Sequence, residues 1–149
     1  MSLPLTVPAA APTRLDPAER AAVTEAIARV VTDGPWIGGS AVERFESDFA
    51  DYLGATEVVG VGNGTDALAL AFAALDLSRG SGILVAANEG GYSASAARQA
   101  GLEPIVMDID GTTLMPTVAT AEAAMTSKTS AVVVTHLHGD AVDIPSLDT

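Results

Sequence analysis

A glycine-rich turn, Gly62-Asn63-Gly64, followed by Thr65 and Asp66, is the clearest candidate for phosphate binding in this 149-residue chain. It separates a β-branched run at 57–61 from an alanine-rich stretch at 65–77 that predicts a helix. Glycines let the backbone approach a ligand closely, and amides in the first turn of a helix carry partial positive charge. Thr65 adds a hydroxyl donor. A turn of this kind can also be only a turn, so its chemistry alone leaves both interpretations open.

The turn differs from the two common nucleotide-binding loops. A P-loop ends in Gly-Lys-Ser/Thr, and the dinucleotide fingerprint has a third glycine where this chain has Leu68 or a near neighbour. The sequence therefore favours a ligand with a single phosphate group over a pyrophosphate.

A second cluster, His136-Leu137-His138-Gly139-Asp140 with nearby Asp143, has residue types that bind metals. If 130–137 is a strand, alternate side chains face one way and the two imidazoles converge. The hydrolase pattern of this type has a further histidine where Ala141 stands here. The alternative, which the ligand count favours, is that these residues shape the turn after the strand and bond to backbone. We therefore assign no metal site.

Strands and helices alternate along the chain, and this alternation must position the glycine-rich turn. Near-continuous apolar strands alternating with helices predict an α/β fold, with helices around a mostly parallel sheet. Ligands of such sheets bind beyond the carboxyl ends of the strands. We expect strands at 57–61, 83–87, 104–108 and 130–137, and helices at 65–77, 93–100 and 117–125.

Two further helices precede this alternation. Each is predicted to begin with a capping box and to end at a glycine. The capping pairs are Asp16 with Glu19 and Ser40 with Glu43, and the closing glycines are Gly34 and Gly54. We expect residues 1–15 to form an extended arm and 16–149 a single domain. Because 143–147 predicts the first turn of another helix, we expect that domain to be truncated.

Composition excludes several functions. The chain has no cysteine, hence no disulfide, thiolate metal site or cysteine nucleophile. Its formal net charge of −12 repels phosphate backbones, so no nucleic-acid partner is expected. It has neither a basic start nor an apolar run of membrane-spanning length, so we expect a cytoplasmic protein with no membrane partner.

Five segments, in matching order and spacing from about Arg20 onward, resemble the DegT/DnrJ/EryC1/StrS aminotransferase family. The most specific is Asn63-Gly64-Thr65-Asp66-Ala67-Leu68, preceded by Tyr52-Leu53-Gly54. The others are Pro35-Trp36-Ile37-Gly38-Gly39 with Val42-Glu43-Arg44-Phe45-Glu46, Ala100-Gly101-Leu102-Glu103-Pro104 with Asp108-Ile109-Asp110, Lys128-Thr129-Ser130-Ala131-Val132, and His136-Leu137-His138-Gly139 with Asp143.

This resemblance implies the N-terminal part of a fold-type-I large domain that binds pyridoxal 5'-phosphate (PLP). It also implies a homodimer with active sites at the subunit interface. The reaction would transfer an amino group from an amino-acid donor, glutamate or glutamine, to a nucleotide-sugar substrate, a nucleotide-linked keto-sugar. By the same resemblance, Thr65 and the backbone of Asp66 would hold the cofactor phosphate, and Gly64 would permit its close approach.

The chain departs from the family pattern at the aromatic residue that usually stacks on the pyridine ring. Counting back from Gly101, that position is Gly90 in this sequence. Tyr92, two residues further on, is a candidate to supply the ring instead. Its other interpretation is an ordinary amphipathic residue at a helix start.

The second departure concerns the catalytic groups. In the family, the lysine that forms the Schiff base and the carboxylate that pairs with the pyridine nitrogen lie beyond the point where this chain ends. Lys128, the only lysine, aligns with a surface position, so we assign no catalytic residue and expect the 149-residue chain itself to be inactive. Two alternatives stay open: a PLP-dependent sugar dehydratase of the same family, and a non-catalytic truncated binding module.

Overall fold

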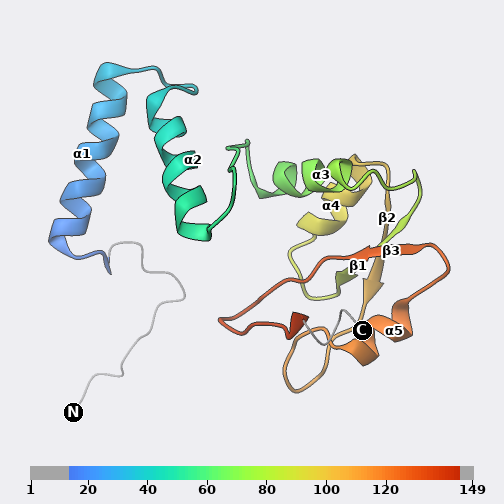
Figure 1. Cartoon of the computed structure of the whole chain (residues 1–149). Coiled ribbons are helices and arrows are strands. Elements are labelled where there is room, and N and C mark those ends of the chain that lie inside the picture. Colours follow the sequence, from blue (N-terminus) through green and yellow to red (C-terminus); the bar gives the residue numbers. More distant parts are fainter. Residues whose placement is uncertain (1–13, 145–149) are drawn as a thin grey trace, which may run out of the picture. The chain divides into compact units, whose positions relative to one another are not determined.

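A computed structural model describes residues 14–144 of the chain, which divides into two compact units on either side of the bond between Gly60 and Val61 (Figure 1). The first unit contains two helices, α1 (Pro17–Asp33) and α2 (Ser40–Leu53). The arm predicted for residues 1–15 lies outside the described residues, except for Arg14 and Leu15. No helix within 14–144 is long and apolar enough to cross a membrane.

The capping box predicted for α1 is confirmed. Oδ1 of Asp16 accepts hydrogen bonds from the amides of Ala18 and Glu19 at 2.7 and 3.0 Å. In return, the Asp16 amide donates to the Glu19 carboxylate at 3.2 Å. These bonds satisfy amides that the first helical turn would otherwise leave without partners, and Gly34 closes the helix as predicted.

The capping box predicted for α2 is wrong. Ser40 is the first helical residue rather than the cap, and Gly39 precedes it with a φ of 83° and no side-chain hydrogen bond. The carbonyl of Gly39 instead accepts from the amides of Val42 and Glu43. Only the backbone caps this helix, because a left-handed residue with no side chain occupies the capping position. Gly54, also left-handed, ends α2 as predicted.

The strand predicted at 57–61 is not formed. A β-branched run becomes a strand only where another strand edge pairs with its backbone. Among the described residues no strand pairs with this segment. Instead of a bond to another strand, this segment makes a bond to a side chain: the amide of Gly60 donates to Oε1 of Glu46, on α2, at 2.6 Å.

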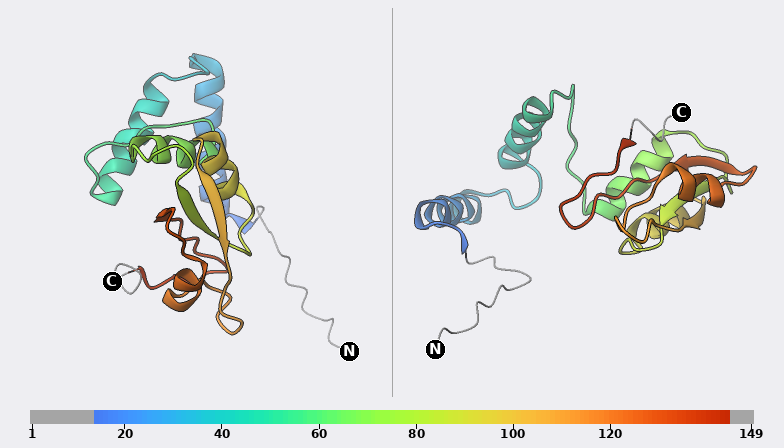
Figure 2. Two further views of the ribbon diagram at one scale, coloured as in Figure 1. Left: turned by 90° about the vertical axis from the view of Figure 1, so that its right-hand side faces the viewer. Right: turned by 90° about the horizontal axis from the view of Figure 1, so that it is seen from below.

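The second unit is a parallel three-stranded sheet with helices on both faces, which confirms the predicted α/β class (Figure 2). The strands lie in the order β2-β1-β3. The elements in chain order are α3 (Gly64–Ala74), β1 (Gly82–Ala86), α4 (Tyr92–Gln99), β2 (Glu103–Met107), α5 (Val118–Ala124) and β3 (Thr129–Val132).

The central strand β1 is buried along its whole length and divides the core into two layers. Ile83 and Val85 pack against a cluster formed with α3 and α4, which includes Phe72 of α3. Leu84, on the opposite face, packs with Met107 of β2 and is covered by α5. This alternation follows from the two-residue period of a strand, and it explains why the β1 sequence is apolar throughout.

β3 ends at Val132, five residues before the predicted end at 137. Its last paired residue lies beside Leu84, and the amide of Val133 still donates to the Leu84 carbonyl at 2.9 Å. β1 continues beyond Leu84 to Ala86, but residues 133–137 leave its edge and follow an irregular path. The strand predicted at 130–137 is therefore confirmed for 130–132 and wrong for 133–137.

The strand order creates a crevice beside β1. The chain leaves β1 through α4 to form β2 on one side, and later forms β3 on the other side. The carboxyl ends of β1 and β3 therefore flank a point where the direction of winding reverses. In open α/β sheets, this is the place where ligands bind.

Candidate functional site

A cavity of about 1040 Å³ lies in the second unit and is lined from three directions. The start of α3, the turn between β1 and α4, and the segment after β3 each contribute to its wall. The four residues predicted to bind cofactor all line it: Gly64, Thr65, Asp66 and Tyr92. The structure thus brings together residues that are up to 28 positions apart at the reversal point of the sheet.

In the first turn of α3, some backbone amides donate hydrogen bonds within the described residues and others do not. Oδ1 of Asn63 accepts from the amide of Asp66 at 2.9 Å, and the Asn63 carbonyl accepts from the amide of Ala67 at 3.0 Å. No hydrogen bond from the amides of Gly64 and Thr65 is recorded within residues 14–144. Two free amides at a helix N-terminus, with the Thr65 hydroxyl beside them, suit an anionic oxygen.

The side chain of Asp66 is held beside the turn. Its Oδ2 accepts from Nδ2 of Asn63 at 2.8 Å, so the two side chains form a reciprocal pair. A Cβ on Gly62 would lie 2.7 Å from the same oxygen. A side chain at position 62 would therefore displace the carboxylate from this place. Sequence analysis assigned Asp66 a backbone role and missed Asn63, although Asn is among the best N-cap residues.

Tyr92, the first residue of α4, lies over Gly90. A Cβ built on Gly90 would lie 2.6 Å from Cε2 and 2.9 Å from Cδ2 of the Tyr92 ring. The ring therefore covers the space that a side chain at position 90 would enter. It remains 65% exposed and lines the cavity, so one face is available to a flat ligand.

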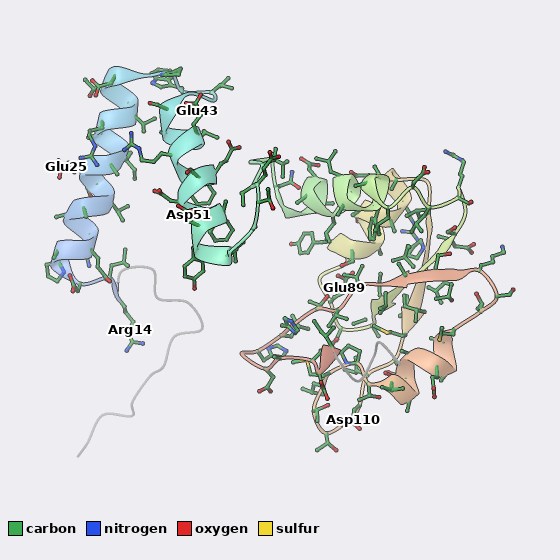
Figure 3. All side chains as sticks on the ribbon, in the orientation of Figure 1. Arg14, Glu25, Glu43, Asp51, Glu89 and Asp110 are labelled. Atoms are coloured by element: carbon green, nitrogen blue, oxygen red, sulfur yellow. The ribbon has the colours of Figure 1, made fainter. Side chains whose placement is uncertain are left out.

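Glu89 is fixed at the start of α4 (Figure 3). Its Oε2 accepts from the Ser93 hydroxyl at 2.6 Å and from the Ser93 amide at 3.3 Å, and Ser93 is only 3% exposed. Glu89 and Asp66 both line the cavity, whereas no Lys or Arg does so among the described residues. Anion binding here would therefore depend on amides, hydroxyls and imidazole. The sequence analysis missed Glu89, whose signal is a carboxylate four residues before a helix-start serine.

His136 also lines the cavity, in the segment after β3. Its Nδ1 accepts from the amide of Val142 at 3.0 Å. Because β3 ends at Val132, the premise that His136 and His138 alternate on one strand is wrong. Within residues 14–144, no three His, Asp, Glu or Cys side chains lie close enough together to hold a metal ion.

Asp110 closes a turn after β2, outside this cavity (Figure 3). The amide of Thr113, the amide of Thr112 and the Thr113 hydroxyl all donate to its Oδ1, at 2.8, 3.0 and 3.1 Å. These donors stabilise the carboxylate and lower the pKa of Asp110 below its ordinary value of 3.8. The residue is part of the family-like segment, and its role here is to shape the turn.

Lys128 precedes β3, at the amino end of the sheet, whereas the cavity lies beyond the carboxyl ends. Its Nζ pairs with Oε2 of Glu103 at 3.7 Å, and both side chains are largely exposed. This position agrees with the surface role expected from the sequence.

Residues 17–149 match the DegT/DnrJ/EryC1/StrS aminotransferase family, and the chain belongs to that family. It is 33% identical over 129 residues to dTDP-3-amino-3,4,6-trideoxy-alpha-D-glucose transaminase of Micromonospora megalomicea subsp. nigra, which covers 87% of this chain and 34% of the relative. The chain thus spans about a third of the length of the curated relatives it matches.

Solved structures agree with this assignment. A complex of S. venezuelae DesV with a ketimine intermediate matches with a TM-score of 0.79 and 31% identity, covering 88% of this chain and 35% of that one. E. coli GDP-4-keto-6-deoxy-D-mannose-3-dehydratase with bound hydrated PLP matches at 0.74 and 26%, covering 91% and 35%. The fold is therefore part of the PLP-dependent sugar aminotransferase architecture, with helices around a parallel sheet.

Proposed function

We propose that the chain forms the cofactor-phosphate corner of a PLP-dependent aminotransferase that acts on a nucleotide-linked keto-sugar, with glutamate or glutamine as amino donor. The observation that carries this proposal is the pair of free amides on Gly64 and Thr65, at a cavity beside the reversal point of the sheet. Family membership supports the cofactor class, and the activity of the transaminase relative supports the substrate class.

The proposed roles follow from what each group can donate. The amides of Gly64 and Thr65 and the Thr65 hydroxyl would hold the phosphate, because all three are hydrogen-bond donors at a helix N-terminus. The Asp66 amide would join them only if the Asn63 side chain released it. The ring of Tyr92 would lie against the pyridine ring, in place of an aromatic side chain at Gly90. Bound PLP would supply the electron sink for amino transfer.

We propose that the 149-residue chain binds PLP without turnover. The only lysine, Lys128, lies at the end of the sheet opposite the cavity, so it is not placed to bond to the cofactor aldehyde. A dehydratase of the same family is the second candidate, supported by the match to the E. coli dehydratase structure.

We further propose a homodimer, as the family resemblance implies. Phe45, Phe49 and Tyr52 of α2 form a stack of near-parallel rings with centroids 5.5 and 6.1 Å apart, and all three are exposed. An exposed aromatic row of this kind suits a protein partner. Analytical ultracentrifugation of the chain and of a Phe45→Ser variant would test this.

The test of cofactor binding is a PLP titration of the chain followed by the absorbance of the cofactor. Thr65→Val should weaken PLP binding by about tenfold or more, because it removes a hydrogen bond to a charged group. Thr56→Val is the matched control, since Thr56 is exposed and belongs to the other unit. Inorganic phosphate should compete with PLP. Equal affinity of the two variants, with no competition by phosphate, would reject the proposal.

A further inference from the structure

The hydrogen bond from the Val142 amide determines which form of His136 is present. An amide can donate only to an unprotonated nitrogen, so Nδ1 carries no proton while the 3.0 Å bond is made. The neutral ring must then carry its proton on Nε2. Val142, which carries the donor amide, is buried. The bond from the backbone therefore selects one tautomer of His136. In this tautomer Nδ1 accepts from Val142, and Nε2–H is a donor.

That donor belongs to a side chain lining a cavity whose other side-chain donors are all uncharged among the described residues. Among the described lining residues, the side-chain N–H and O–H groups come from Asn, Thr, Tyr, Ser, Gln and His, and none from Lys or Arg. Asn63 and Ser93 already donate to carboxylates. Because Asp66 and Glu89 also line the cavity and no Lys or Arg does among the described residues, an anionic ligand would depend on neutral donors.

We propose that His136 is a binding residue, whose Nε2–H donates to an anionic oxygen of the ligand in this cavity. The Val142 amide acts as its partner by locking the tautomer that makes Nε2 a donor. This inference rests on the proposed function, because it takes PLP as the ligand. PLP offers two groups of the required chemistry, its phosphate and the oxygen on its pyridine ring.

Two substitutions separate this role from a purely structural one. His136→Gln places an amide nitrogen near the position of Nε2, which keeps a donor but loses the acceptor for Val142. His136→Asn places an amide oxygen near the position of Nδ1, which keeps that acceptor but loses the distal donor. A binding role predicts that Gln retains PLP affinity within about threefold, whereas Asn weakens it by about fivefold or more.

A structural role predicts the opposite order, and that order would overturn the inference, as would equal effects of both variants. Urea unfolding of both proteins would show whether either variant fails to fold. Nitrogen NMR of the wild-type imidazole then provides an independent test. We expect a protonated Nε2 and a bare Nδ1 in the free chain, and a shift of the Nε2 resonance on adding PLP. A protonated Nδ1, or an unmoved Nε2 with PLP bound, would contradict the inference.

Separate titrations with pyridoxal and with inorganic phosphate identify which oxygen accepts the bond. The Asn variant should weaken binding of the probe that carries that oxygen and spare the other. If PLP binds and Thr65→Val weakens it while both His136 variants bind normally, this inference fails and the proposed function stands. If the chain binds no PLP, both fail together.

Discussion

The contact between Tyr92 and Gly90 allows a quantitative test of how the ring is placed. Gly90→Ala would put a methyl carbon 2.6 Å from Cε2 of Tyr92, whereas carbon atoms in contact are about 3.5 to 4.0 Å apart. The ring would have to retreat by roughly 1 Å. Displacing a side chain from its preferred rotamer by about 30° costs about 0.5 to 1.5 kcal/mol.

A second effect has the opposite sign. The backbone at Gly90 does not have a left-handed φ, so alanine fits there without backbone strain. Replacing glycine by alanine at such a site stabilises a protein by about 0.4 to 1 kcal/mol, because the unfolded chain loses freedom. Gly90→Ala should therefore be near neutral in the wild-type chain and stabilising in a Tyr92→Ala background. The expected coupling energy is about 1 kcal/mol.

The assay is a double-mutant cycle measured by urea unfolding of four proteins: wild type, each single variant and the double variant. Distant, independent substitutions add to within about 0.3 to 0.5 kcal/mol. If Gly90→Ala changes the unfolding free energy equally with and without the Tyr92 ring, the ring does not occupy the space over Gly90. The argument for Tyr92 as the substitute aromatic would then be refuted.

Two further predictions concern local hydrogen bonds. Asn63→Ala should lower the unfolding free energy by about 1 kcal/mol, because the Asp66 amide loses its cap, and an unchanged urea midpoint would contradict this. The folded-state pKa of Asp110 lies below its ordinary value of 3.8, so its carboxylate contributes stability that is present above that value and lost as pH falls below it. Thr113→Val should raise this pKa toward 3.8 in a carbon NMR titration of the carboxyl, and an Asp110 that titrates at 3.8 in the wild type would contradict the structure.

Local sequence signals predicted the elements that depend on neighbouring residues. The Asp16 capping box and the buried β1 run were both recognisable, because their causes lie within a few positions. The run at 57–61 has the composition of a strand, and its own residues do not reveal that it forms none. A strand needs a partner strand, and the described residues provide none for this segment. The end of β3 is likewise not visible in its own apolar sequence, because the chain leaves the edge of β1 after Val132 while β1 continues to Ala86.

The candidate site was predicted in part for the same reason. The glycine-rich turn indicates Thr65 as a donor and Gly64 as the point of close approach, and the structure places both at the cavity with Tyr92. The bond between His136 and Val142 joins residues six positions apart in irregular backbone, and no periodic pattern indicates it. The Asn63 cap, in contrast, has a local signal, because Asn is a favoured residue directly before the first turn of a helix.

The most direct test of the central claim is the amide NMR spectrum of the chain during addition of PLP. The account predicts that the Gly64 and Thr65 amide resonances shift most, and that inorganic phosphate reproduces part of the shift. Binding of PLP that leaves these two amides unmoved, or that perturbs only the surroundings of Lys128, would contradict it.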